Sequence, residues 1–162
     1  PELSHKGKII LITGSSSGIG YAIARGFAKS GAKEVILTGR RESLVNTAVE
    51  DLNSQFPETR FLGLQIDISD VKSIELMWRQ LDAEKRVVDV LVLNAARVQK
   101  SGSMVDIGHE EVWADFVTNV GSHMAFADFF YHQKKRDASK KLVSPSATLS
   151  QQRRAPFNGQ QS

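Results

Sequence analysis

Glycine and serine make up most of a short segment, TGSSSGIG at residues 13–20, which follows an apolar run and precedes a helical pattern. Glycine lets the backbone approach a pyrophosphate closely, and the N-terminus of a helix offers free N–H groups to an anion. Serine hydroxyls add hydrogen-bond donors. This context predicts a nucleotide-binding loop. The alternative is a tight strand-to-helix turn in which the glycines serve packing alone.

The elements that must position this loop follow from alternating apolar runs and helical periodicities. Strands are expected at residues 8–13, 34–38, 60–66, 87–93 and 141–143. Helices are expected from the glycine loop to Gly31, at 42–55, from Ser69 or Asp70 through Leu81, at 107–118 and at 121–136. Such alternation predicts a doubly wound α/β fold, a Rossmann-type parallel sheet with helices on both faces. With strand order 3-2-1-4-5, ligands bind outside the carboxyl ends of the strands.

Several of the expected helices have readable apolar stripes. In the first helix, Ile19, Ile23 and Phe27 repeat at i, i+4 and i+8. The inner face of the helix that begins at Ser69 or Asp70 is expected to consist of Ile74, Met77, Trp78 and Leu81.

Composition bounds the domain organisation. The 162 residues are 41% hydrophobic and 24% charged, which suits one globular domain. Residues 1–130 hold 14 basic and 17 acidic residues, whereas residues 131–162 hold seven basic residues and one acidic residue. We expect a Rossmann-type domain at 1–143 and a basic, disordered tail at 144–162. The tail has little aromatic interleaving, so no nucleic-acid partner is expected.

Several chemistries are excluded by residue type and spacing. Cysteine is absent, so there is no disulfide, thiolate metal site or cysteine nucleophile. The four histidines lack metal-ligand spacing, and no metal is expected. No apolar run approaches the roughly 20 residues that span a bilayer, and no signal-peptide pattern is present. A cytoplasmic location without a membrane partner is therefore expected.

The spacing T-G-x-x-x-G-x-G resembles that of the short-chain dehydrogenase/reductase family, and other landmarks follow in that family's order. Arg40 and Arg41 follow the second expected strand, and Asp67 follows the third. Asn94 begins Asn-Ala-Ala where the family usually has Asn-Asn-Ala-Gly, and Asn119 resembles the family's Asn before its long interface helix. The resemblance covers residues 6–144.

The resemblance implies a nicotinamide cofactor, NADP(H) in preference to NAD(H). Members specific for NAD place an acid after the second strand, whereas this chain has Arg40, which could bind a 2′-phosphate. The alternative for Arg40 and Arg41 is a solvated pair, and Asp67 could be a cap or turn residue rather than an adenine contact. The implied cofactor-binding residues are Gly14, Ser16, Ser17, Gly18, Ile19, Gly20, Arg40, Asp67 and Asn94.

The family's catalytic residues follow the order Asn, Ser, Tyr, Lys. Asn119 matches the Asn, and Ser146 loosely matches the Ser. No tyrosine follows Tyr131, so the family's Tyr-x-x-x-Lys is absent after Ser146. Tyr131 and Lys135 are four residues apart, but Tyr131 lies 12 residues beyond Asn119, about 18 Å along a helix. The chain is therefore expected to be C-terminally truncated relative to the family.

Two functions remain open. The first is an NADP(H)-dependent oxidoreductase that transfers hydride between the cofactor and a small carbonyl or alcohol substrate, with the activity of this truncated chain in doubt. The second is a catalytically inactive nucleotide-binding or interaction module, or a non-functional truncation product. The apolar helix at 121–136 resembles the family's dimer interface, and we expect it to pair with a second copy or to promote aggregation.

Overall fold

Five parallel strands form the centre of the computed structural model, which describes residues 4–97, 102–133 and 141–143. The strands are β1 (Ile9–Ile12), β2 (Glu34–Gly39), β3 (Arg60–Gln65), β4 (Val90–Val92) and β5 (Lys141–Val143). Their order in the sheet is β3-β2-β1-β4-β5, and every neighbouring pair is parallel. The predicted strand order is confirmed, although β4 is shorter than the segment expected at 87–93.

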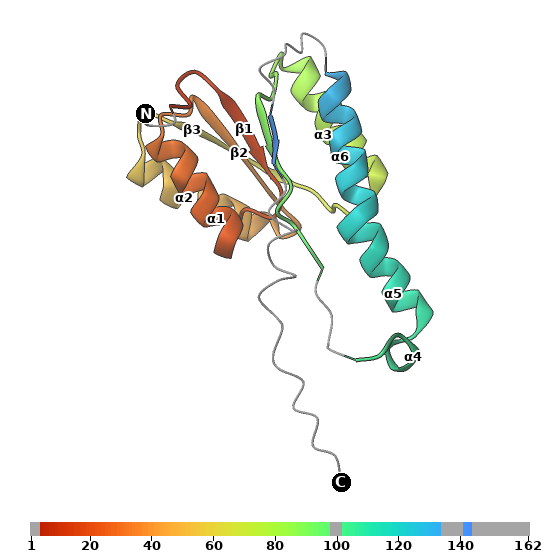
Figure 1. Ribbon diagram of the computed structural model, residues 1–162. Coiled ribbons are helices and arrows are strands. Elements are labelled where there is room, and N and C mark those ends of the chain that lie inside the picture. Colours follow the sequence, from red (N-terminus) through yellow and green to blue (C-terminus); the bar gives the residue numbers. More distant parts are fainter. Residues whose placement is uncertain (1–3, 98–101, 134–140, 144–162) are drawn as a thin grey trace.

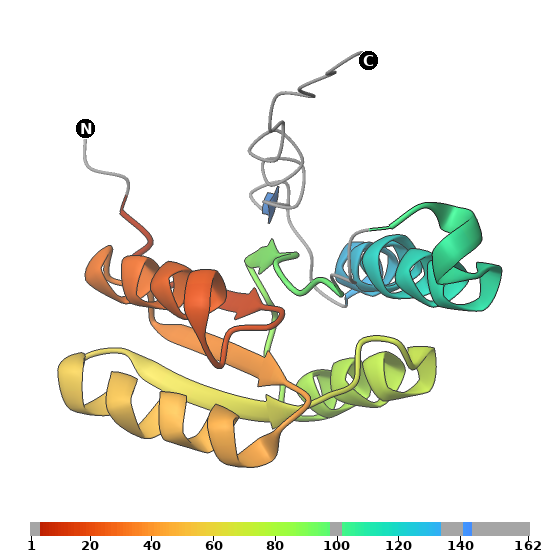
Figure 2. The same cartoon turned by 90° about the horizontal axis from the view of Figure 1, so that it is seen from below.

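Helices cover both faces of the sheet (Figures 1 and 2), as the doubly wound fold requires. Helices α1 (Gly18–Lys29) and α2 (Glu42–Gln55) lie on one face. On the other face lie α3 (Val71–Ala83) and α6 (Ser122–His132). A short α4 (Met104–Ile107) and α5 (His109–Phe116) precede α6, and the π-helical turn η1 (Val117–Gly121) joins α5 to α6. No helix within the described ranges has both the length and the apolar character needed to cross a membrane.

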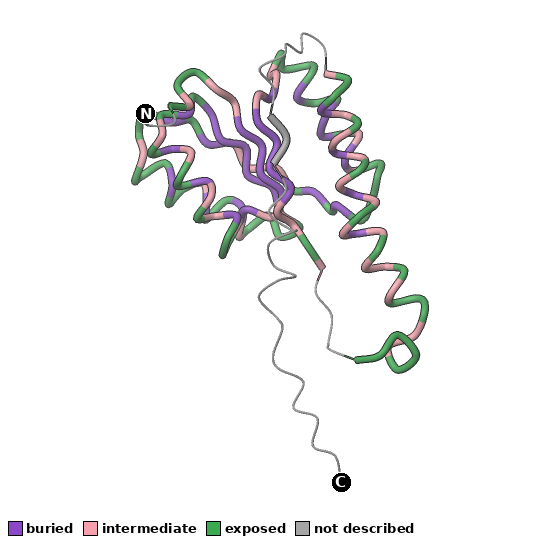
Figure 3. Tube along the Cα trace, viewed as in Figure 1, coloured by how far each residue is buried: buried purple, intermediate pink, exposed green. Residues whose placement is uncertain are grey.

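The central strands β1, β2 and β4 are almost entirely buried, as the purple tube in Figure 3 shows. Ile10 and Ile12 pack towards α1 and α2, whereas Leu11 between them packs towards α3 and α6. Phe126 of α6 is fully buried in the second layer. This two-sided burial explains why the strand sequences are continuous apolar runs rather than alternating ones.

Helix α1 packs through a different stripe from the one that its large apolar residues suggest. Its buried residues are Gly20, Ala24 and Ala28, and Ile19 is 53% exposed. Small side chains let the helix axis approach the sheet closely, and Ile23 and Phe27 fill the flanks of the contact. The start of α1 must lie beside the carboxyl end of β1. The close approach of the helix to the sheet therefore places its small residues, and not its large apolar ones, on the inner face.

Helix α3 agrees with the sequence-based expectation. The Asp70 carboxylate caps it by accepting a hydrogen bond from the N–H of Lys72 at 3.0 Å. All four residues of the expected inner face are buried: Ile74, Met77, Trp78 and Leu81. The helices expected at 107–118 and 121–136 instead form one stretch from His109 to His132, interrupted by η1, and residues 134–136 lie outside the described part.

Candidate functional site

A cleft of about 650 Å³ lies at the carboxyl ends of β1 to β4. It is lined by the loop after β1, by the ends of β2, β3 and β4, and by α5 and η1. Seven of the predicted cofactor-binding residues line it: Gly14, Ser16, Ser17, Ile19, Arg40, Asp67 and Asn94. The topology brings these residues together because parallel strands end at the same edge of the sheet.

The glycines of the loop meet different requirements. Gly14 and Gly18 have φ angles of +63° and +58°, a region that side chains disfavour. A Cβ atom on Gly14 would lie 2.9 Å from both Cα and Cβ of Ala95. A Cβ atom on Gly20 would lie 2.4 Å from the carbonyl oxygen of Gly14. Gly18 and Gly20 therefore shape the loop beside the cleft, whereas Gly14 also lines it.

Ser15 joins the loop to β2, a role that the sequence analysis missed. Its N–H donates to the carbonyl of Thr38 at 2.9 Å, and its Oγ accepts from the N–H of Thr38 at 3.0 Å. The same hydroxyl donates to the carbonyl of Ile12 at 2.8 Å, and Ser15 is fully buried. Of the three consecutive serines, the first therefore holds the loop while Ser16 and Ser17 face the cleft.

Thr13 and Asn94 join the loop to β4. Thr13 Oγ1 accepts hydrogen bonds from the N–H groups of Asn94 and Ala95, each at 3.0 Å. Asn94 Nδ2 donates to the carbonyls of Thr13 and Gly14, also at 3.0 Å. Asn94 is thus a structural residue whose amide fixes the loop, and Thr13 is a site residue that the sequence analysis did not single out. Its position directly after an apolar strand was the available signal.

The charged residues of the cleft gather at the ends of β2 and β3. Arg40 and Arg41 are exposed, and neither forms an ion pair with another residue that the structure describes. Asp67 Oδ1 accepts hydrogen bonds from the N–H and Oγ of Ser69, at 2.9 and 2.7 Å. These bonds from Ser69 lower the pKa of Asp67, with a smaller contribution from Arg40. The turn role expected as the alternative for Asp67 is therefore present in a residue that also lines the cleft.

Asn119 lies in the π-helical turn, and its side chain binds backbone rather than open cleft. Its Oδ1 accepts from the N–H of Arg97 at 2.7 Å, and its Nδ2 donates to the carbonyl of Arg97 at 2.8 Å. The Arg97 guanidinium in turn pairs with Glu111 and Asp115, at 2.5 and 3.2 Å. In the geometry described, Asn119 is a positioning residue that holds the loop after β4.

Ser146, the second predicted catalytic residue, lies outside the described residues, as does Lys135 of the Tyr131–Lys135 pair that the sequence order argues against. Tyr131 is 60% exposed on α6 and is not among the lining residues. The cleft-lining residues within the described ranges include no tyrosine, lysine or histidine.

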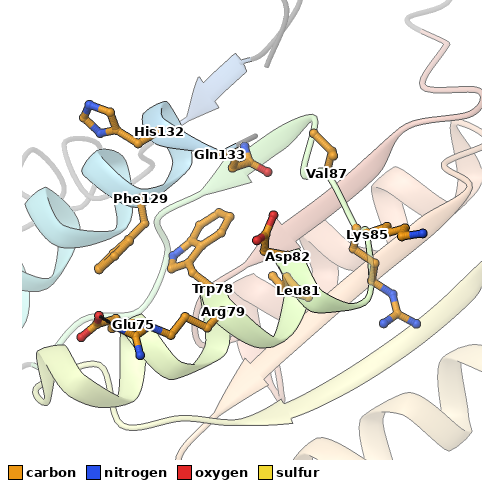
Figure 4. A pocket seen from close by; sticks show the side chains of 11 residues that line it. Glu75, Trp78, Arg79, Leu81, Asp82, Lys85, Val87, Phe129, His132 and Gln133 are labelled. Carbon is orange, nitrogen blue, oxygen red and sulfur yellow. Dashed lines mark hydrogen bonds and ion pairs between the residues drawn. The ribbon is translucent and has the colours of Figure 1, made fainter. Parts of the chain in front are cut away.

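A second cavity, of about 410 Å³, lies between α3 and the end of α6 (Figure 4). Its apolar wall includes Trp78 and Phe129, which come from opposite helices. Gln133 anchors this end of α6, since its Oε1 accepts from the N–H of Val88 at 2.7 Å and its Nε2 donates to the Val88 carbonyl at 3.2 Å. This cavity contains none of the predicted site residues.

Comparisons with known proteins agree with this fold and cleft. Residues 8–155 match the family described as short chain dehydrogenase. The chain belongs to this family. The match extends beyond residues 6–144, where the sequence resemblance was recognised, and into the segment 144–162.

Individual relatives show how much of the family's length is present. An NADP-dependent 3-hydroxy acid dehydrogenase of Schizosaccharomyces pombe is 36% identical over 135 residues, which cover 81% of this chain and 52% of the relative. The structure of L-sorbose reductase from Gluconobacter frateurii, complexed with NADPH and L-sorbose, has a TM-score of 0.73 at 28% identity and covers 80% of this chain and 48% of the other. The chain therefore spans about half the length of these relatives.

Proposed function

We propose that the chain binds NADP(H) in the cleft and contributes the cofactor-binding half of an oxidoreductase acting on a small carbonyl or alcohol substrate. The observation that carries this proposal is the combination of the glycine loop at the start of α1 with the exposed arginines Arg40 and Arg41, which line the same cleft. The family's nicotinamide chemistry and the NADP-dependent relatives support it.

The residues present fit a dinucleotide. Gly14 and Gly20 carry no Cβ atom, and this leaves room for the backbone and side-chain atoms that surround them in the loop. The first-turn N–H groups of α1 have no partners within the helix, and Ser17 at the N-cap makes no side-chain capping bond. This end of α1, with Ser17, is suited to hold the diphosphate.

The 2′-phosphate of NADP(H) is assigned to the end of β2. A Cβ atom on Gly39 would lie 3.2 Å from Ser16 Oγ, so Ser16 approaches the backbone just before Arg40. A serine hydroxyl and two guanidinium groups without an ion pair among the described residues form a suitable anion site. Asp67 and Asn94 complete the adenosine end of the cleft.

The cofactor supplies a hydride donor or acceptor when bound. The described residues of the chain bind and orient it: Thr13, Ser15 and Asn94 fix the loop, and Asn119 fixes Arg97 at the far side of the cleft. Membership of the family supports the proposed substrate class, a small carbonyl or alcohol compound.

A second candidate function is nucleotide binding without turnover. It is favoured by the absence of tyrosine, lysine and histidine among the described cleft-lining residues, because proton transfer requires a group within about 3 Å of the reacting oxygen. Turnover assays with NADPH and a panel of small aldehydes and ketones separate the two candidates. Cofactor oxidation that depends on the carbonyl compound supports the oxidoreductase, and tight binding without oxidation supports the module.

Titration of the purified chain with NADPH and with NADH tests the cofactor assignment. We expect micromolar binding with NADPH preferred, and we expect Arg40→Ala to weaken NADPH binding about tenfold or more while leaving NADH binding nearly unchanged. Arg25→Ala, which removes an exposed arginine from α1 outside the cleft, is the matched control for charge. Equal losses for both cofactors in Arg40→Ala would contradict the preference, and no binding of either by the unaltered chain would contradict the proposed function.

The division into a domain at 1–143 and a tail at 144–162 remains a proposal. Deletion of residues 144–162 should leave NADPH affinity unchanged within about twofold. A larger loss would show that the segment, part of which matches the family, belongs to the folded unit.

A further inference from the structure

His123 of α6 contacts the loop that follows β4. Its Nε2 lies 3.1 Å from the carbonyl oxygen of Ala95. A carbonyl oxygen only accepts hydrogen bonds, so this contact assigns the ring proton to Nε2. In the sequence the histidines were candidates only as metal ligands, a role that their spacing argues against.

Ala95 occupies a central place in the candidate site. Its N–H donates to Thr13 Oγ1 at 3.0 Å. Its Cα and Cβ both lie 2.9 Å from the position that a Cβ atom on Gly14 would take. The position of Ala95 therefore sets the space beside Gly14, and both residues line the cleft.

The loop at 94–97 is held from two different layers. Thr13 holds its beginning from β1, and Asn119 holds Arg97 at its end from the π-helical turn. His123 binds between these points, at the carbonyl of Ala95. Loss of the His123 bond would remove the contact that holds Ala95 between these two points, and we expect its hydrogen bond to Thr13 to loosen as a result.

We propose that His123 is a positioning residue of the cofactor cleft, whose Nε2–H holds Ala95 against Gly14 and keeps the loop in its binding-competent form. This inference rests on the proposed function, because it assigns the held loop to NADP(H) binding. His123 is not among the cleft-lining residues and acts through Ala95.

Three variants separate a hydrogen-bonding role from packing. In His123→Gln the side-chain Nε2 can reach the place of the imidazole Nε2, whereas in His123→Asn the amide nitrogen corresponds to Nδ1 and falls short. His123→Leu retains an apolar side chain without a donor. We expect NADPH affinity to fall about tenfold in the Asn and Leu variants and to stay within about threefold in the Gln variant, as for loss of one hydrogen bond.

The control is His132→Leu, the same change on the same helix, at a residue that lines the other cavity. It should leave NADPH affinity unchanged. Affinity losses in the His123 variants that follow their melting temperatures, with no rescue by Gln, would overturn the proposal.

Amide hydrogen exchange can be measured without a nucleotide, so it tests the holding role of His123 independently of the proposed function. The N–H of Ala95 should exchange faster in His123→Leu than in the unaltered chain or in His123→Gln. If the unaltered chain binds neither nicotinamide nucleotide, the proposed function fails and the assignment of the loop to the cofactor fails with it. Unchanged exchange at Ala95 would by itself refute the holding role of His123.

Discussion

Asn94 Nδ2 lies 2.6 Å from the position that a Cβ atom on Gly20 would occupy. The same nitrogen donates to the carbonyls of Thr13 and Gly14. The first turn of α1, the glycine loop and the end of β4 therefore meet at one point with no room for a further carbon atom. This contact explains why residue 20 is glycine although it lies inside a helix.

Gly20→Ala should therefore destabilise the protein and weaken NADPH binding. Overpacking of this kind costs about 1–3 kcal/mol, and the backbone of Gly14 and Ser15 must shift to relieve it. Urea unfolding and NADPH titration measure the two effects. Gly26→Ala is the control on the same helix, where a Cβ atom meets nothing within 4 Å. It should be neutral or stabilising by about 0.5–1 kcal/mol, and equal losses in the two variants would count against the steric explanation.

Thr13→Val should have a comparable cost for a different reason. The Thr13 hydroxyl is the acceptor for the N–H groups of Asn94 and Ala95, and the residue is fully buried. The isosteric valine leaves these groups without that acceptor, at about 1–3 kcal/mol for each group that stays unsatisfied. Thr13→Ser keeps the hydroxyl and should retain most of the stability and the affinity for NADPH. A serine variant as damaged as the valine variant would show that the methyl group matters more than the hydrogen bonds.

Much of the fold and the approximate location of the site were predictable from the sequence. Continuous apolar runs such as the one ending at Ile12 identify buried parallel strands, and the polar residues that follow them must converge at one sheet edge. The choice of Ser15 over Ser16 as the anchoring serine was not predictable, because the three serines are chemically identical and only the shape of the loop distinguishes them. The inner face of α1 was misjudged because alanine and glycine contribute little apolar signal.

The π-helical turn was also beyond the sequence pattern. One extra residue in a helical turn changes which side chains share a face of the helix. The apolar pattern before the turn, at Phe116, and after it, at Phe126, still reads as ordinary α-helix. Its consequence for the site is specific, since Asn119 lies within it and binds the backbone of Arg97. The backbone contacts of Asn119 were therefore not predictable from the sequence pattern.

The pH dependence of stability should carry a contribution from Asp67. Hydrogen bonds from Ser69 lower the pKa of Asp67 in the folded protein, so the unfolded chain binds this proton more tightly. The resulting stabilisation is present above the ordinary aspartate value of about 3.9 and is lost as pH falls through the lower folded-state pKa. Urea unfolding between pH 6 and pH 3 should show a smaller acid-induced loss in Asp67→Asn than in the unaltered chain. Parallel curves for the two proteins would argue against this contribution.

An exposed apolar stripe on α5, η1 and α6 should promote self-association. Phe116, Val120 and Met124 follow one another at helical spacing and are 51%, 39% and 67% exposed. Met124→Glu places a charge in the stripe and should shift the protein towards the monomer in sedimentation velocity experiments. Leu76→Glu is the control, because Leu76 is 64% exposed on α3 and lies outside the stripe. A monodisperse monomer in the unaltered chain would contradict the expectation.

The hydrogen bonds between Thr13 and Asn94 join positions 81 residues apart in the chain. Contacts between such distant residues close a long loop of chain, so we expect the cleft to be completed at a late stage of folding. A nucleotide in this cleft would recognise the docked arrangement of β1 and β4, which β1, β2 and β3 alone do not provide. Binding therefore draws the population towards the fully assembled sheet, and the nucleotide concentration becomes a determinant of how much of the chain is folded.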